Sequence, residues 1–138
     1  MIILDTNVVS EALRARPDPV VVAWLEGSDG PQAITAITLG ELLAGLRRLP
    51  PGQRRTTLTQ TLLRALEPYR AARILPFEAL AAEEYAQIVA DRTARGLPIS
   101  TGDAQIASIC RVHGAPLATR NTKDFLHTGV RLIDPWQA

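Results

Sequence analysis

The chain has 138 residues, of which 46% are hydrophobic and 21% are charged, and its formal net charge is +1. This composition excludes an intrinsically disordered chain, and the near-neutral charge excludes a polycation that binds nucleic acid by bulk attraction. The length is typical of one domain, so we predict a single domain over residues 1–138.

The first half of the chain alternates short apolar runs with helical patterns. Residues 2–4 are a short apolar run, and residues 6–13 then carry apolar side chains at helical spacing, which predicts a strand followed by a helix. Prolines and glycines delimit a short helix over residues 20–25, and residues 33–35 predict a second buried strand. Residues 38–49 place their leucines on one face of another helix.

The second half continues the alternation of helices and strands. It predicts, in order, a helix over about 58–69, a strand over 73–75, a helix over 78–95, a helix opened by Ser100, and strands over 116–119 and 130–133. Strands separated by helices, with no hairpin signal, indicate an α/β fold with a mostly parallel central sheet covered by helices on both faces. In such folds ligands bind just beyond the carboxyl ends of the strands.

Four acidic residues lie where such a fold places a ligand site. Asp5 directly follows the first strand, and Asp124 follows a later one. Glu41 and Asp103 fall in the first turns of their predicted helices, where free amides and the helix dipole stabilise a carboxylate. Helix capping is the alternative for each of the four acids. Capping does not explain why all of them would converge on one edge of the sheet.

A cluster of carboxylates needs a compensating charge, because carboxylates within about 4–6 Å repel and raise at least one pKa. Oxygen ligands without His or Cys select a hard cation, Mg²⁺ or Mn²⁺, rather than zinc. A metal held in this way can polarise a phosphodiester and activate a water molecule. The four acids therefore predict a magnesium-dependent hydrolytic site.

Four motifs in a fixed order support this prediction. They are Leu4-Asp5-Thr6-Asn7 and residues 37–45, 103–107 and 117–125. Together they resemble the motifs of PIN-domain ribonucleases, of the VapC type that acts as the toxin in bacterial toxin–antitoxin pairs. The resemblance implies a PIN-like three-layer α/β/α fold and hydrolysis of RNA by metal-activated water, leaving a 5′-phosphate and a 3′-hydroxyl without a covalent intermediate.

The resemblance also implies a role for each acid. Asp5 and Asp103 would be direct metal ligands, and Glu41 would be a ligand or a partner bridged by water. Asp124 would be the fourth acid, acting directly, through water or at a second metal position. A catalytically weak RNA- or partner-binding module is the alternative function, and the presence of all four acids argues against it.

Polar residues next to the acids have implied roles as well. The resemblance implies that Thr6 and Asn7 surround the first acid and that Asn121 orients the loop of the last acid, with capping and turn formation as alternatives. Arg120 and Lys123 are close enough in sequence to Asp124 to contact RNA phosphate, although solvated surface is the alternative for each of them.

The family resemblance further implies a homodimer that binds a small antitoxin in an apolar groove near the acids. The candidate groove residues are Leu13, Val21, Trp24, Leu25 and Leu46. Ordinary core packing is the alternative for these residues.

The sequence also predicts a setting for the protein. Cys110 has no second cysteine to pair with, so we expect it to be a small buried apolar residue in a cytoplasmic, reducing setting. No stretch reaches membrane-spanning length, and Asp5 interrupts the N-terminal apolar run before it is long enough for a signal peptide. We therefore expect neither export nor a membrane anchor.

Overall fold

The computed structural model describes residues 1–70 and 72–138 and contains one parallel five-stranded sheet in the order β3-β2-β1-β4-β5. The strands are β1 (Ile2–Leu4), β2 (Gln32–Thr35), β3 (Ile74–Leu75), β4 (Leu117–Ala118) and β5 (Leu132–Ile133). Every neighbouring pair is parallel, which confirms the predicted α/β class.

The central strand β1 marks the point where the winding of the sheet changes direction. Ile3 pairs with Ala33 of β2 on one side and with Leu117 of β4 on the other. The chain moves outward from β1 through β2 to β3, and then returns to the opposite side of β1 with β4 and β5. A crevice for a ligand is expected at such a switch point, beyond the carboxyl ends of β1 and β4.

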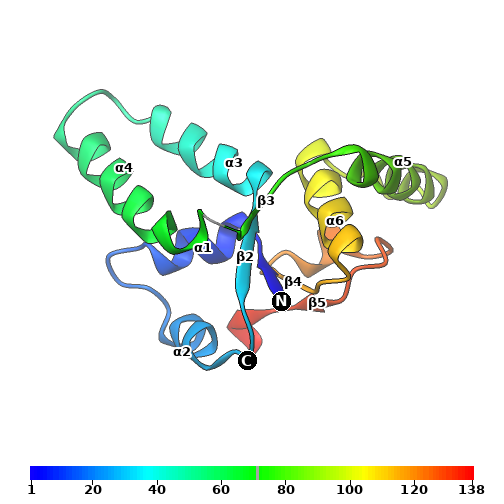
Figure 1. The fold of residues 1–138 in the computed structure, drawn as a ribbon, viewed down its shortest axis with the longest axis horizontal. Coiled ribbons are helices and arrows are strands. Elements are labelled where there is room, and N and C mark those ends of the chain that lie inside the picture. Colours follow the sequence, from blue (N-terminus) through cyan, green and yellow to red (C-terminus); the bar gives the residue numbers. More distant parts are fainter. Residues whose placement is uncertain (71) are drawn as a thin grey trace.

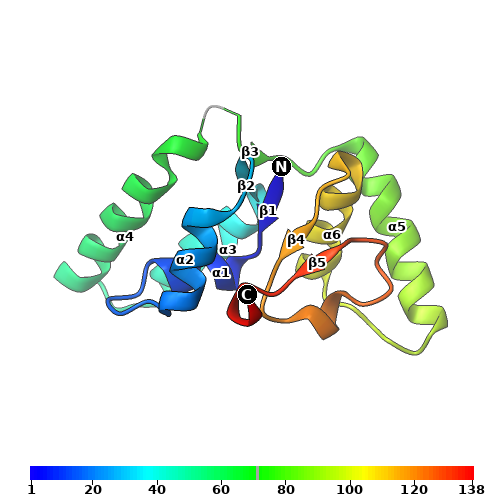
Figure 2. The ribbon, with the colours of Figure 1, turned by 90° about the horizontal axis from the view of Figure 1, so that it is seen from below.

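Helices cover both faces of this sheet, as Figures 1 and 2 show. They are α1 (Thr6–Ala12), α2 (Pro19–Gly27), α3 (Ala36–Arg47), α4 (Gln53–Leu66), α5 (Ala79–Ala94) and α6 (Thr101–His113), with 3-10 turns η1 (Glu67–Tyr69), η2 (Thr122–Phe125) and η3 (Pro135–Gln137). In Figure 1, α5 and α6 lie on one side of the strands, and α1, α2 and α4 lie on the other.

Two apolar clusters fill the space between the layers, one on each face of the sheet. Successive strand residues point to opposite faces, so Ile3 joins the cluster under α5 and α6 while Leu4 joins the one under α1, α2 and α4. Ala33 and Ile34 of β2 divide in the same way. This alternation produces the predicted three-layer arrangement.

Three helices begin earlier than the sequence predicted. The α3 helix begins at Ala36 because Thr35 caps it, its hydroxyl oxygen accepting a hydrogen bond from the Thr38 amide at 3.1 Å. The predicted start of this helix at residue 38, with Glu41 in the first turn, was therefore wrong. The α4 helix begins at Gln53 rather than near Leu58. The prediction missed its first turn because the residues there are polar and carry no apolar periodicity.

The α2 helix also begins one residue earlier than predicted, at Pro19. Its packing changes the set of residues that could form the predicted groove. Asp18 caps it by accepting from the Val20 amide at 2.9 Å. Val21 is fully buried, and Trp24 and Leu25 pack against the same core. Leu13 and Leu46 pack against this core as well, and they are the two predicted groove residues that line the apolar cavity described below.

Cys110 is fully buried in the other cluster, as predicted, and burial strongly raises the pKa of its thiol. Within the described part of the chain, no helix combines the length and apolar character that a bilayer crossing needs.

Candidate active site

Asp5 lies at the carboxyl end of the central strand and is only 5% exposed. Its amide continues the ladder by donating to the Ala118 carbonyl at 2.9 Å. Its carboxylate accepts from the Thr6 amide and the Thr119 hydroxyl, both at 2.8 Å, and more weakly from the Asn7 side-chain amide at 3.4 Å. These donors hold a buried carboxylate in one orientation at the predicted crevice.

Glu41 comes from α3 and is tied to the Asp5 region through Thr6. The Thr6 hydroxyl donates to Oε1 of Glu41 at 2.8 Å and lies 3.1 Å from the hydroxyl of the buried Thr38. On the other side, a Cβ added to Gly102 would lie 3.6 Å from Oε2 of Glu41. The start of α6 therefore packs closely against the Glu41 carboxylate.

Asp103 is half-buried in the first turn of α6, as predicted. The Ser100 hydroxyl accepts from its amide at 3.2 Å and caps the helix. The capping interpretation thus applies to Ser100, and the Asp103 carboxylate remains directed toward the site, where it lines the same cavity as Asp5 and Glu41.

Asp124 lies at the border of this group. It belongs to the η2 turn, and its side chain does not line the cavity formed by the other three acids. It is nevertheless close enough for its charge to raise the pKa values of both Asp5 and Asp103. The structure thus brings three of the four predicted acids onto one cavity and leaves the fourth beside it.

The electrostatics of the group are those of crowded acids. Burial is the main cause that raises the pKa of Asp5, with hydrogen bonds from Thr119 and Thr6 acting against it and the charges of Glu41 and Asp124 adding to it. For Asp103, burial again raises the pKa most, followed by the charge of Asp5. Ionising Asp5 and Asp103 is therefore less favourable in the folded protein than in water, and a bound cation would offset that cost.

The cavity that receives these side chains has a volume of about 450 Å³. It is lined by Asp5, Thr6, Asn7, Ser10, Glu11, Arg14, Glu41, Asp103, Arg120, Asn121 and Trp136. Lys123 is exposed and does not line this cavity, whereas Arg120 does. The wall thus contains acids, two cations and an aromatic ring.

The predicted polar neighbours connect β1 to the loop after β4. The Asn7 side chain donates to the Thr119 hydroxyl at 3.2 Å and accepts from the Arg120 amide at 3.2 Å. Asn121 lines the cavity, and its carbonyl accepts from the Asp124 amide at 3.0 Å. Thr119, fully buried between these groups, was missed as a site residue, although its place at the end of a predicted strand was visible in the sequence.

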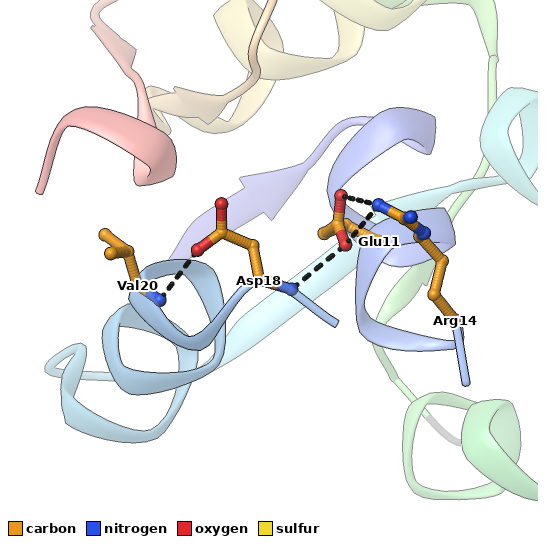
Figure 3. A network of polar contacts seen from close by, with 4 residues as sticks. All are labelled: Glu11, Arg14, Asp18 and Val20. Carbon is orange, nitrogen blue, oxygen red and sulfur yellow. Dashed lines mark hydrogen bonds and ion pairs between the residues drawn. The ribbon is translucent and has the colours of Figure 1, made fainter. Parts of the chain in front are cut away.

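A fourth carboxylate in the wall, Glu11, was also missed (Figure 3). It is 6% exposed and accepts from Nη1 of Arg14 with both oxygens at 3.1 Å, and from the Asp18 amide at 3.1 Å. Its oxygens are thus occupied by a cation and by the loop before α2. The Arg14 side chain, 64% exposed, extends from this pair along the cavity.

Trp136 of η3 is a further missed residue. The Arg120 guanidinium carbon lies 5.1 Å from the centre of its ring, within the range of a cation–π contact. Both residues line the cavity that the acids line. No local pattern in the sequence indicates this pairing, because the C-terminal turn reaches the site only through the fold.

The donor set suits a hard divalent cation, because the acids offer only oxygen and neither His nor Cys lines the cavity. Among residues 1–70 and 72–138, no group of three or more His, Cys, Asp or Glu side chains already stands in an arrangement that would hold an ion. The residues therefore fit such an ion by their chemistry and their shared cavity rather than by a closed ligand cage.

We expect Asp103→Asn to raise the melting temperature of the metal-free protein at neutral pH, because it removes a carboxylate whose pKa is raised by burial and by Asp5. Because the pKa of Asp103 is raised in the folded protein, the ionised carboxyl destabilises the fold fully at pH values above that raised pKa. This destabilisation fades as the pH falls and disappears below the ordinary value near 3.8. Thermal unfolding of both proteins between pH 7 and pH 3.5 measures this difference.

Asp29→Asn provides the matched control, because Asp29 is exposed in a turn and carries the same charge. Its melting temperature should follow that of the unmodified chain at each pH. A lower melting temperature for Asp103→Asn than for this control at pH 7 would contradict the view that the acids repel one another.

The chain is similar in sequence to a known protein family and to proteins of known name. A family model described as the PIN domain matches residues 2–130. The chain is 39% identical over 138 residues to VapC ribonuclease Y4jK of Sinorhizobium fredii, covering 99% of each chain. It is 39% identical over 137 residues to toxin FitB of Neisseria gonorrhoeae, again covering 99% of each.

Solved structures with the same fold include complexes. The crystal structure of FitAcB from Neisseria gonorrhoeae superposes with a TM-score of 0.92 at 38% identity over 100% of both chains. The DNA-bound VapBC complex from Salmonella typhimurium superposes with a TM-score of 0.77 at 25% identity, covering 98% of this chain and 99% of that one.

Proposed function

The chain belongs to the PIN-domain family, among its VapC and FitB toxins, and on this premise we propose that it is a magnesium-dependent endoribonuclease toxin restrained by a cognate antitoxin. The observation that carries the proposal is the meeting of Asp5, Glu41 and Asp103 on one cavity at the switch point of the sheet. Independent helix capping would not explain why three acids from separate elements meet at one cavity.

In this proposal Asp5 and Asp103 hold Mg²⁺ or Mn²⁺ directly, and Glu41 contributes directly or through water. Asp124, outside the cavity wall, acts through water or by its charge. The ion supplies polarisation of the phosphodiester and activation of water. Thr6 and Thr119 keep the carboxylates of Glu41 and Asp5 oriented, which is the ordinary role of groups around a metal ligand.

The other residues of the wall suit RNA. Arg120 and Arg14 offer guanidinium groups for phosphate, and the Trp136 ring beside Arg120 offers an aromatic surface of the kind on which bases stack. Cys110 is buried with a raised thiol pKa, which argues against a cysteine nucleophile and favours direct attack by water. Products with a 5′-phosphate and a 3′-hydroxyl are expected.

A second cavity supports the antitoxin part of the proposal. It measures about 260 Å³ and is lined by Thr6, Ser10, Leu13, Glu41, Leu42, Gly45, Leu46, Leu58, Thr61 and Leu62. Its leucines come from α3, α4 and the residue that directly follows α1, and they form an apolar groove of the kind that receives an amphipathic helix. We propose that the antitoxin binds here, as antitoxins accompany toxins in the FitAB and VapBC complexes.

The proposal also includes a homodimer and action in the cytoplasm, where a toxin would meet RNA. Sedimentation equilibrium of the purified chain should give twice the monomer mass of 15.0 kDa. A monomer at micromolar concentration would remove the homodimer from the proposal without affecting the nuclease.

Cleavage of a single-stranded RNA by the purified chain with Mg²⁺ tests the proposed function. We expect products with 5′-phosphates, identified by end labelling, and loss of cleavage when the cognate antitoxin is added. Leu46→Glu should keep the cleavage rate while weakening this inhibition at least about 10-fold, because it places a charge in the apolar groove.

Thr57→Glu is the matched control, an exposed α4 position outside the groove where a new charge should leave inhibition unchanged. RNA that is bound but never cut would favour the alternative of a catalytically weak binding module. Products with 2′,3′-cyclic ends would reject hydrolysis by activated water.

A further inference from the structure

Arg92, in the last turn of α5, is a buried cation without a carboxylate partner. Its residue is 5% exposed, and within residues 1–70 and 72–138 no acid lies within 4.0 Å of its guanidinium. A buried charge is unfavourable unless hydrogen bonds compensate it. The partners of Arg92 therefore indicate what it does.

All of these partners are backbone carbonyls, from two separate segments. Nε donates to Leu97 at 2.7 Å, and Nη2 lies 3.5 Å from the Pro98 carbonyl. Nη1 donates to Asp124 at 2.9 Å and to Leu126 at 2.6 Å. One guanidinium thus joins the connection between α5 and α6 to the η2 turn.

The η2 turn is held firmly around its acid. Phe125, 1% exposed, anchors it in the core, and the Thr128 hydroxyl donates to the Phe125 carbonyl at 2.6 Å. With the two bonds from Arg92, three consecutive carbonyls beginning at Asp124 are bound by side chains. This is more restraint than a surface turn needs to remain folded.

The other segment bound by Arg92 leads directly into α6. Leu97 also donates its own amide to the Arg92 carbonyl at 2.9 Å. A few residues later, Ser100 caps the helix that carries Asp103. Arg92 therefore bridges the backbone next to two of the four acids.

We propose that Arg92 is a positioning residue that holds Asp124 at a fixed place beside Asp103, so that both acids serve the same divalent cation. This inference rests on the proposed function. Only a planar guanidinium presents donors to both segments at once, whereas an ammonium or an amide at this position reaches fewer carbonyls. Asp124 lies outside the cavity wall, so its contribution depends on where its backbone is held.

Binding of Mn²⁺ alone, measured by isothermal titration calorimetry, tests the proposal without relying on RNA cleavage. We expect Arg92→Gln to weaken Mn²⁺ affinity about 10- to 100-fold, the usual effect of removing a group that orients a ligand. Arg92→Lys keeps the positive charge, so it should lose less Mn²⁺ affinity than Arg92→Gln. In an Asp124→Asn background, Arg92→Gln should change the affinity less than about twofold, because the residue that it positions is already removed.

Arg111→Gln is the matched control. Arg111 donates to the Thr128 carbonyl at 3.3 Å and pairs with Glu84 at 2.7 Å, so it also braces the loop after η2 without contacting the Asp124 backbone. Its loss should lower the melting temperature and leave Mn²⁺ affinity unchanged. Circular dichroism verifies folding, and Arg92→Lys carries the test if Arg92→Gln does not fold.

Unchanged Mn²⁺ affinity in Arg92→Gln would overturn the proposal. An equal loss in the Asp124→Asn background would overturn it as well, because the effect would then not pass through Asp124. Absence of Mn²⁺ binding by the unmodified chain is a different outcome, which rejects the proposed function and any part that Arg92 has in it.

Discussion

We expect replacement of Asp103 by Asn to lower the rate of RNA cleavage by about 10³-fold or more. The substitution keeps the size of the side chain and removes the negative charge that would bind the cation. Because Asp103 is half-buried and repelled by Asp5, the variant should fold at least as well as the unmodified chain. Initial rates of cleavage at saturating Mg²⁺ measure the effect.

Asp5→Asn should reduce cleavage to the same extent, but this substitution also disturbs the hydrogen bonds around the side chain. The donors from Thr6 and Thr119 that now meet a carboxylate would partly meet an amide group. Asp29→Asn, an exposed change of equal charge, should retain full activity. Cleavage by Asp103→Asn at the rate of this control would end the nuclease interpretation.

Removal of divalent metal should abolish cleavage as completely as loss of an acid. EDTA in excess should reduce the rate to background, and Mg²⁺ should restore it. Mg²⁺ at 100 times its Kd adds about 2.7 kcal/mol to the free energy of unfolding. For a chain of 138 residues this corresponds to a rise in melting temperature of roughly 9 °C.

Two controls separate binding from simple screening of the crowded acids. NaCl at the same ionic strength screens the acids without coordinating them, so its effect should be much smaller. Asp103→Asn should lose most of the shift with Mg²⁺. Equal shifts with NaCl and MgCl₂, or full cleavage in EDTA, would contradict a metal-dependent site.

Much of the architecture could be predicted from local patterns. The order of strands and helices follows from short apolar runs separated by helical periodicity, and the acid after β1 follows from its position at a strand end. Asp103 was correctly assigned to a first turn because Ser100 is a cap that the sequence displays. These features depend on neighbours in the chain, which is the information that a sequence provides directly.

Other features depended on contacts between distant residues. The Thr35 hydroxyl caps α3, although the sequence pattern placed Thr35 in a strand and the start of the helix at residue 38. Val21 resembles a groove residue by hydropathy and is buried only because the sheet covers it. Trp136 reaches the cavity only because the last turn folds back beside Arg120. Such outcomes are decided by tertiary packing rather than by propensity.

The two cavities have Thr6, Ser10 and Glu41 in common. In the proposed arrangement the antitoxin occupies one cavity and the RNA substrate occupies the other. A mutation at Thr6 or Glu41 that weakens antitoxin binding then also lowers the cleavage activity, since Thr6 orients the Glu41 carboxylate. Evolution of new toxin and antitoxin pairs is then confined to groove residues that the acidic cavity does not share, such as Leu46 and Leu58. Partner choice can drift there while the chemistry stays fixed.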